Sequence, residues 1–217
     1  MISFGASRHD GPQEHLPPRD GTLRIVLIGS ESTGKTTLAQ ALATALGSMW
    51  VAEYSRAFAQ RAGRTLSADD VAAIANGQVA DEEAGVLALA RRRRVIPPAT
   101  QEIVLDTDLV STTVYAALYY GECPARILAA ARARLGDLYL LCLPDIPWQA
   151  DGVRDQPGAR RELHECFAAR LAEWNATVVV VGGVGAHRLE HALAAVRGWR
   201  AAHAQRVRAA TPEAGRR

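Results

Sequence analysis

Short continuous apolar runs alternate along the chain with longer segments in which apolar residues recur every three or four positions. The continuous runs predict strands buried on both faces, at Leu23–Ile28, Met49–Ala52, Ile103–Leu105, Leu138–Leu143 and Thr177–Val181. The periodic segments predict helices, at Lys35–Leu46, Ser67–Arg94, Leu109–Tyr120, Pro124–Leu135, Arg160–Trp174 and Ala186–Gln205. Repeated strand–helix–strand units favour an α/β fold of three layers, with a central parallel sheet of about five strands and helices on both faces.

The pattern contains no internal repeat and no linker, so we expect one domain at 22–205. A flexible leader at 1–21 and a basic tail at 206–217 flank it. The leader has acids and prolines where a signal peptide needs apolar residues, and no apolar run approaches the ~18 to 20 residues of a membrane span. The sequence therefore predicts a cytoplasmic protein without a membrane segment.

Composition adds little to this picture. The 217 residues are 48% hydrophobic and 22% charged, as in ordinary globular proteins, and the net charge of +2 says little about partners. Arginines are abundant from Arg188 onward, which suits either contact with nucleic acid or a basic helix end in solvent. We favour the second, and nucleic acid is an unlikely partner. The spacing of Cys123, Cys142 and Cys166 predicts reduced thiols. An oligomer is possible but not readable from the sequence.

One lysine stands among the 25 basic residues, and it lies in a motif. The segment Gly29–Thr36, GSESTGKT, fits G-x-x-x-x-G-K-[ST] between a predicted strand and a predicted helix, which predicts a nucleoside triphosphate site. Lysine is a compact charge that a tight loop admits, whereas arginine is a broad planar fork. We expect ATP to bind at Gly29, Ser32, Thr33, Gly34, Lys35, Thr36 and Thr37, and the Thr36 hydroxyl to hold Mg²⁺.

Acidic residues follow two predicted strands. Asp106, at the end of Ile103–Leu105, suits a Mg²⁺ or water contact. Asp108 suits a hydroxylated substrate or a cap on the next helix, and it can do both. Without a second lysine a guanine-reading [NT]KxD motif is impossible, and no strand ends in the Asp-Glu pair of motor ATPases.

Glu53 and Arg56 follow the second predicted strand and reach the same edge of the sheet. Glu53 is placed to take the proton from an attacking hydroxyl, although Asp106 remains an alternative base. Arg56 can stabilise charge on the transferred phosphoryl group, and Tyr54 is assigned with it to the acceptor. The alternative is an ordinary surface Glu and Arg in a first helical turn.

A long proline-punctuated segment at about 145–161 follows the fourth predicted strand and has the character of a lid. Its arginines, Arg154, Arg160 and Arg161, are placed to close over the phosphates, and not all of them need act. Trp148, with Asp145 and Asp151 on either side, suits a flat cationic ring; the alternative is a buried structural tryptophan.

Four segments together, GSESTGKTT, EYSR, DTD and LCLPDIPWQADGVRD, resemble the ribosylnicotinamide kinase domain at the C-terminal end of NadR proteins, from about Leu23 to Ala195. The resemblance implies a P-loop nucleoside-kinase-like fold that moves the ATP γ-phosphoryl group to the 5′-hydroxyl of nicotinamide riboside. It implies Gly34, Lys35 and Thr36 on ATP and Mg²⁺, and Glu53, Asp106 and Asp108 around the ribose. It also implies Arg154 and Arg161 as lid arginines and Arg188 near the adenine.

Full NadR proteins carry an adenylyltransferase domain before the kinase, and about 22 residues precede the first predicted strand here. We therefore expect that second activity to be absent. Two alternatives remain open: a kinase for another nucleoside or small alcohol, and a non-catalytic ATP sensor that acts through its basic last helix.

Overall fold

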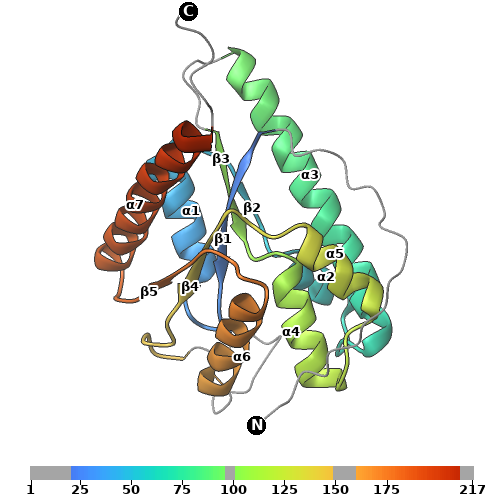
Figure 1. The fold of residues 1–217 in the computed structure, drawn as a ribbon. Helices are drawn as coiled ribbons and strands as arrows, with labels where there is room; N and C mark the ends of the chain where they lie inside the picture. The colour runs from blue at the N-terminus through green and yellow to red at the C-terminus, as the bar shows by residue number, and fades with distance from the viewer. Residues whose placement is uncertain (1–20, 96–100, 149–159, 211–217) are drawn as a thin grey trace, which may run out of the picture.

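A computed structural model describes residues 21–95, 101–148 and 160–210, and in them five strands form one parallel sheet. The strands are β1 (Leu23–Ile28), β2 (Trp50–Val51), β3 (Glu102–Asp106), β4 (Leu138–Cys142) and β5 (Val178–Val181). Their order is β2-β3-β1-β4-β5, and every neighbouring pair is parallel. The expected three-layer α/β fold is confirmed (Figure 1).

Helices cover both faces of this sheet. Their bounds are α1 (Lys35–Leu46), α2 (Tyr54–Ala62), η1 (a 3₁₀ turn, Ala68–Asp70), α3 (Val71–Val95), α4 (Leu109–Tyr120), α5 (Ala125–Ala133), α6 (Arg160–Glu173) and α7 (Ala186–Ala210). α1 and α7 cover one face, and α3 to α6 lie on the other (Figure 1).

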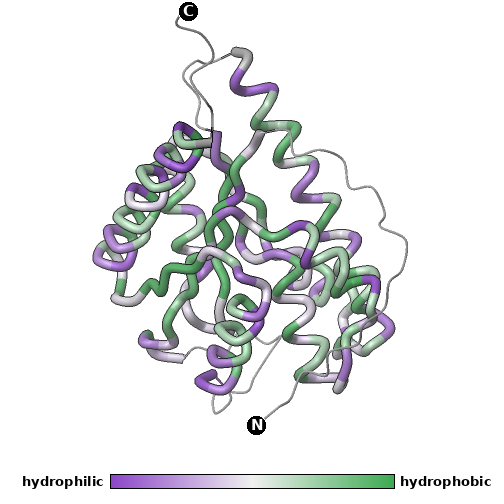
Figure 2. Tube along the Cα trace, viewed as in Figure 1, coloured by the Kyte–Doolittle hydropathy of each residue, from purple (hydrophilic) through white to green (hydrophobic). Residues whose placement is uncertain are grey.

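Alternate residues of each strand serve these two cores. In β1, Ile25 and Leu27 pack with α1 and α7, while Val26 and Ile28 pack on the opposite side. All four are fully buried. Apolar positions accordingly concentrate in the central strands (Figure 2). Burial on both faces explains why the strand runs are continuous rather than alternating.

The structure differs from the expected elements mainly at α2, which the apolar pattern did not predict. The helix has nine residues, and Ser55 is the one buried residue among them, so the short apolar stripe at Tyr54, Ala57 and Phe58 is a weak signal of a helix in sequence. Contacts with α3 hold it instead, because Gly77 leaves room for the Tyr54 ring: a Cβ there would lie 2.1 Å from a ring carbon.

Smaller differences lie at element ends. β2 has two residues, and α7 continues to Ala210 instead of ending at Gln205. A capping box between Ser67 and Asp70 opens a 3₁₀ turn ahead of α3, so α3 itself begins at Val71 rather than at Ser67.

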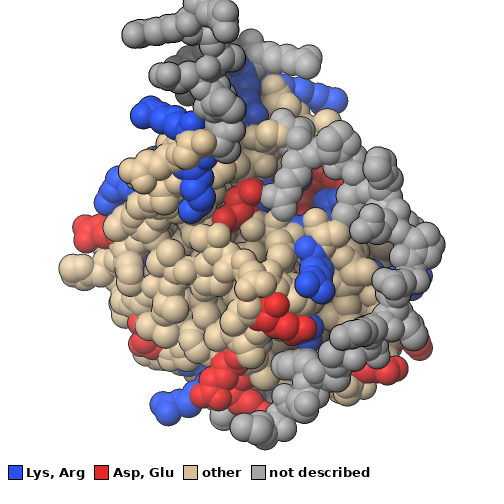
Figure 3. Space-filling view, viewed as in Figure 1, with Lys and Arg blue, Asp and Glu red and all other residues tan. Residues whose placement is uncertain are grey.

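The surface and the cysteines are unremarkable in type. On the face shown in Figure 3, acidic and basic side chains are interspersed with uncharged ones. Cys123, Cys142 and Cys166 are free thiols, as expected. None of the helices within the described ranges is both long and apolar enough to cross a bilayer.

Candidate active site

The carboxyl ends of β1, β3 and β4 meet at one edge of the sheet, where ligands bind in open parallel sheets. Two cavities lie there. The larger, of about 860 Å³, is lined by the loop after β1, the start of α1 and the start of α7. The smaller, of about 400 Å³, is lined by α2, α3 and α4.

The loop after β1 has the backbone of a phosphate cradle. Gly29 passes so close to β4 that a Cβ would lie 2.9 Å from the Cys142 carbonyl oxygen. Ser32 and Gly34 have positive φ values of 51° and 74°, and α1 begins at Lys35. Such turns direct backbone N–H groups towards a bound anion at the helix N-terminus.

The carbonyl groups of this loop are bound by side chains. Thr33 Oγ1 and Lys35 Nζ both donate to the Ser30 carbonyl, at 2.8 and 2.7 Å. Arg160 Nη2 donates to the Ser32 carbonyl at 3.0 Å, and Arg188 Nη1 donates to the Thr33 carbonyl. These contacts fix the loop before any ligand arrives, which reduces the ordering cost of binding.

The Arg188 side chain links the phosphate loop to the segments that follow β4 and β5. Besides the Thr33 carbonyl, its guanidinium donates to the carbonyls of Gly183 (2.6 Å) and Leu143 (3.1 Å) and pairs with Asp145. Asp145 in turn accepts from the Gly183 N–H at 2.6 Å. Arg188 was expected near the adenine and does line the larger cavity, but its donors are committed to protein acceptors. Asp145, expected at the acceptor, lies with Arg188.

Thr36 and Asp106 lie together in the arrangement expected of a Mg²⁺ site. The Thr36 hydroxyl donates to Asp106 Oδ2 at 2.5 Å, and Asp106 Oδ1 is buried with no hydrogen-bond partner among the described residues. Burial raises the pKa of Asp106, while the bond from Thr36 and the charge of Lys35 lower it. The residues fit the ion, because Mg²⁺ in kinases takes one or two protein oxygens and completes its shell with phosphates and water.

Glu53 lines both cavities. It follows β2 and stands at the N-cap position of α2, where Ser55 Oγ donates to its Oε1 at 2.7 Å. Arg56 Nε lies 3.9 Å from its Oε2 and also lines the larger cavity. A carboxylate at this boundary can reach groups bound on either side.

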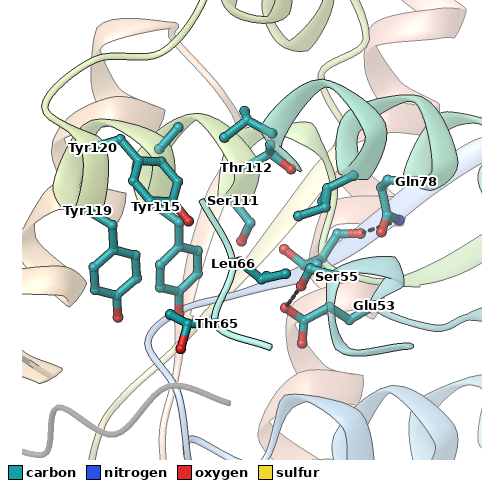
Figure 4. Close-up of a pocket in the computed structure, with 14 residues that line it drawn as sticks. Glu53, Ser55, Thr65, Leu66, Gln78, Ser111, Thr112, Tyr115, Tyr119 and Tyr120 are labelled. Carbon is teal, nitrogen blue, oxygen red and sulfur yellow. Dashed lines mark hydrogen bonds between the residues drawn. The ribbon is translucent and has the colours of Figure 1, made fainter. Parts of the chain in front are cut away.

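The smaller cavity has a polar end and an aromatic end (Figure 4). Glu53, Ser55 and Gln78 lie on one side of the view, and three tyrosines of α4 lie on the other. The tyrosines are Tyr115, Tyr119 and Tyr120, and the first two rings stack at 5.8 Å between centroids.

Thr107 lines this cavity and has a strained backbone. Its φ is 74°, rare for a β-branched side chain, and its N–H donates to the Leu27 carbonyl at 3.0 Å. Its buried hydroxyl has no partner among the described residues. At this turn Asp106 lies beside Thr36, while Asp108 lies in the interior beside Tyr139. Such strain is typical of functional sites.

Asp108 turns into the interior and lines neither cavity. Its carboxylate accepts from the Val110 N–H at 2.9 Å, as the N-cap of α4, and from the Tyr139 hydroxyl at 2.6 Å. Burial raises its pKa to about 6 in spite of these bonds. Of the two roles considered for Asp108, the structure displays the cap.

The remaining expected residues are dispersed. Tyr54 packs on Gly77 beneath Arg61, and neither it nor the half-buried Trp148 lines the two cavities. Arg161 is exposed in the first turn of α6. Asp151 and Arg154 lie outside the described residues.

Several residues that line the two cavities were not predicted from the sequence: Glu31, Gln78, Thr107, Ser111 and the three tyrosines. Only the tyrosines carried a signal. Tyr115 and Tyr119 are four residues apart on a helix that begins directly after Asp108, so they share a face near the end of β3.

The phosphate loop, the strand order and the acids at the strand ends define a P-loop protein of kinase-like architecture. The chain belongs to the family described as AAA domain, whose model matches residues 24–188. In this chain Asp106, Thr107 and Asp108 stand at the end of β3, without the Asp-Glu pair of motor ATPases.

The chain is also similar to NadR. The Trifunctional NAD biosynthesis/regulator protein NadR of Escherichia coli (strain K12) is 27% identical over 161 residues, which are 72% of this chain and 37% of that protein. A crystal structure of NadR in complex with NR is 29% identical, with a TM-score of 0.59 over 82% of this chain and 49% of the other.

A second NadR structure, in complex with NAD and AMP-PNP, is 27% identical, with a TM-score of 0.58 over 83% of this chain and 50% of the other. This chain therefore spans half or less of the length of these relatives. The resemblance to the kinase region of NadR is confirmed.

Proposed function

We propose that the protein is an ATP-dependent kinase that phosphorylates the 5′-hydroxyl of nicotinamide riboside, giving nicotinamide mononucleotide for NAD salvage. The observation that carries this proposal is the position of Glu53, which lines both the phosphate-loop cavity and the smaller cavity. A kinase needs this layout, with a donor site, an acceptor site and a base at their boundary.

The larger cavity suits ATP. Lys35 and Arg56 line it and place positive charge beside the phosphate loop, where the phosphates of ATP would bind. One of the NadR structures holds AMP-PNP, which supports a nucleotide in the equivalent fold. Thr36 and Asp106 would hold Mg²⁺, which neutralises charge on the phosphates when bound.

The smaller cavity suits a riboside. Its polar end, at Glu53, Ser55 and Gln78, matches the hydroxyls of a ribose, and its aromatic end matches a flat ring. The pyridinium of nicotinamide riboside is positive, and tyrosine faces attract a cation. The ring receptor expected at Trp148 is therefore assigned to the tyrosines instead. NadR has been crystallised with NR, which supports the same acceptor here.

The chemistry then follows from placement. The acceptor oxygen attacks the γ-phosphorus, its proton passes to Glu53, and the bond to the bridging oxygen breaks as ADP leaves. Lys35 and Arg56 stabilise the charge on the transferred group. Asp106 makes a poorer base, because it lines neither cavity and its place beside Thr36 suits the metal. Arg154 and Arg161 remain predictions as lid arginines.

The test is ADP formation from MgATP with a panel of acceptors. We expect ADP and nicotinamide mononucleotide in equal amounts with nicotinamide riboside, and little turnover of adenosine, thymidine or cytidine. Preference for one of these neutral nucleosides would retain the mechanism and overturn the substrate. ATP binding without acceptor-dependent ADP would overturn the kinase and favour a sensor.

A further inference from the structure

Glu31 is a carboxylate inside the phosphate loop, a place where a negative charge is unexpected. Its exposed fraction is 3%, and it lines the larger cavity. Its Oε2 accepts a hydrogen bond from the Tyr115 hydroxyl at 3.3 Å. Its Oε1 is buried with no hydrogen-bond partner among the described residues. Since Tyr115 lines the smaller cavity, Glu31 stands between the two compartments.

A buried carboxylate oxygen without a partner is costly, so a ligand that supplies a donor is strongly favoured there. ATP phosphates are acceptors and carry negative charge, so they cannot satisfy Oε1 and are repelled by it. ATP carries its own hydroxyl groups on a ribose beyond the phosphates, whereas the acceptor brings its ribose hydroxyls next to the γ-phosphate that the loop binds. Glu31 therefore matches the acceptor rather than the donor.

We propose that Glu31 binds a 2′- or 3′-hydroxyl of the acceptor's ribose, and that Tyr115 holds the carboxylate in position. This inference rests on the proposed kinase function and adds a specificity-determining residue to it. A site built to hydrogen-bond a substrate hydroxyl discriminates against the analogue that lacks it, because the polar group of the protein is then left unpaired. Glu31 makes the enzyme select ribosides over deoxyribosides.

The test compares kcat/KM for nicotinamide riboside with kcat/KM for its 2′-deoxy and 3′-deoxy forms. In the wild-type enzyme we expect one deoxy form to lose roughly 10- to 100-fold, the range for a hydrogen bond to a charged group. Glu31→Ala is expected to lose a similar factor with the full riboside and almost nothing more with that deoxy form. Glu31→Gln, which keeps an acceptor oxygen, retains part of the preference.

Two further measurements separate this role from a structural one. Tyr115→Phe keeps the ring and removes the donor, so the preference for the hydroxyl should fall while the KM for ATP stays within about threefold. Glu173→Gln is the matched control, since Glu173 is a half-exposed residue at the end of α6 and pairs only with Arg170 in the described contacts; it should change neither value.

The outcomes are distinct. If the wild-type enzyme prefers the full riboside and the Glu31 variants keep the whole preference, the role of Glu31 is overturned and the kinase stands. If the wild-type enzyme phosphorylates no riboside, both proposals fall. A misfolded Ala variant does not block the test, because Glu31→Gln and Tyr115→Phe make the same comparison.

Discussion

Arg188 is expected to determine the shape of the phosphate loop, and Arg188→Met tests this. Methionine keeps much of the stem volume and removes every donor. The side chain is 4% exposed, and its loss leaves the carbonyls of Thr33, Gly183 and Leu143 without this donor and Asp145 without its cation.

The magnitude follows from these partners. An unpaired acceptor costs about 1 to 3 kcal/mol where it is buried, as the Thr33 carbonyl is, and less at the partly buried carbonyls of Gly183 and Leu143. Asp145 adds little, because its side chain is 34% exposed and water screens it. Some carbonyls recover a water, so we expect the free energy of unfolding to fall by about 3 to 5 kcal/mol. For a chain of this size that lowers the Tm by roughly 6 to 20 °C.

The assay is thermal unfolding with and without ATP, together with the KM for ATP. We expect the KM to rise at least about tenfold, because the Thr33 carbonyl is released and the cradle loses its shape. Arg197→Met is the control: Arg197 is an exposed arginine on the same helix, and its loss should change the free energy of unfolding by less than about 0.5 kcal/mol. A Tm for Arg188→Met within about 2 °C of the wild type would refute this role of Arg188 in holding the phosphate loop.

Three further predictions concern Glu53, the buried Glu82 and the packing of α2. Glu53→Gln should lower kcat by about 10²- to 10⁴-fold while the Kd for ATP, measured by calorimetry, changes less than about threefold; an unchanged kcat would exclude Glu53 as the base. Burial raises the pKa of Glu82 from 4.5 to about 8, more than the nearby Arg134 lowers it. The folded state therefore keeps a proton that the unfolded chain loses, and the free energy of unfolding should fall by about 1.4 kcal/mol per pH unit between these values. Glu82→Gln should remove that slope in urea titrations at pH 5.5 and 7.5, and an unaltered slope contradicts the assignment. Gly77→Ala places a Cβ 2.1 Å from the Tyr54 ring and should cost about 1 to 3 kcal/mol with a lower kcat, because α2 carries Glu53; wild-type values would show that α2 adjusts freely.

The parts of the site that sequence predicts well have local causes. Lys35 and Thr36 are fixed by a motif, and Asp106 and Glu53 by the rule that parallel strands end at one edge. The apolar pattern is also a local property of the sequence, and it predicts correctly where β1, α1 and α4 begin and end.

What escaped prediction depends on contacts with the backbone or between distant segments. The partners of Arg188 are mostly carbonyl groups, which leave no trace in the sequence. Tyr115 and Tyr119 look like ordinary core residues of an apolar helix, whereas Trp148 between two acids looked like a ring receptor. Only the packing of α4 against α3, beside the cavity that α2 also lines, distinguishes them.

The shared wall at Glu53 has a pharmacological consequence. Because one side chain borders both cavities, a single molecule with a nucleotide at one end and a flat aromatic ring at the other can fill both at once. Once its first end is bound, the second sees an effective concentration in the millimolar range or above, so affinity rises by about 10²- to 10⁴-fold without any new contact. Such a two-headed ligand would distinguish this protein from the many others that share only its phosphate loop.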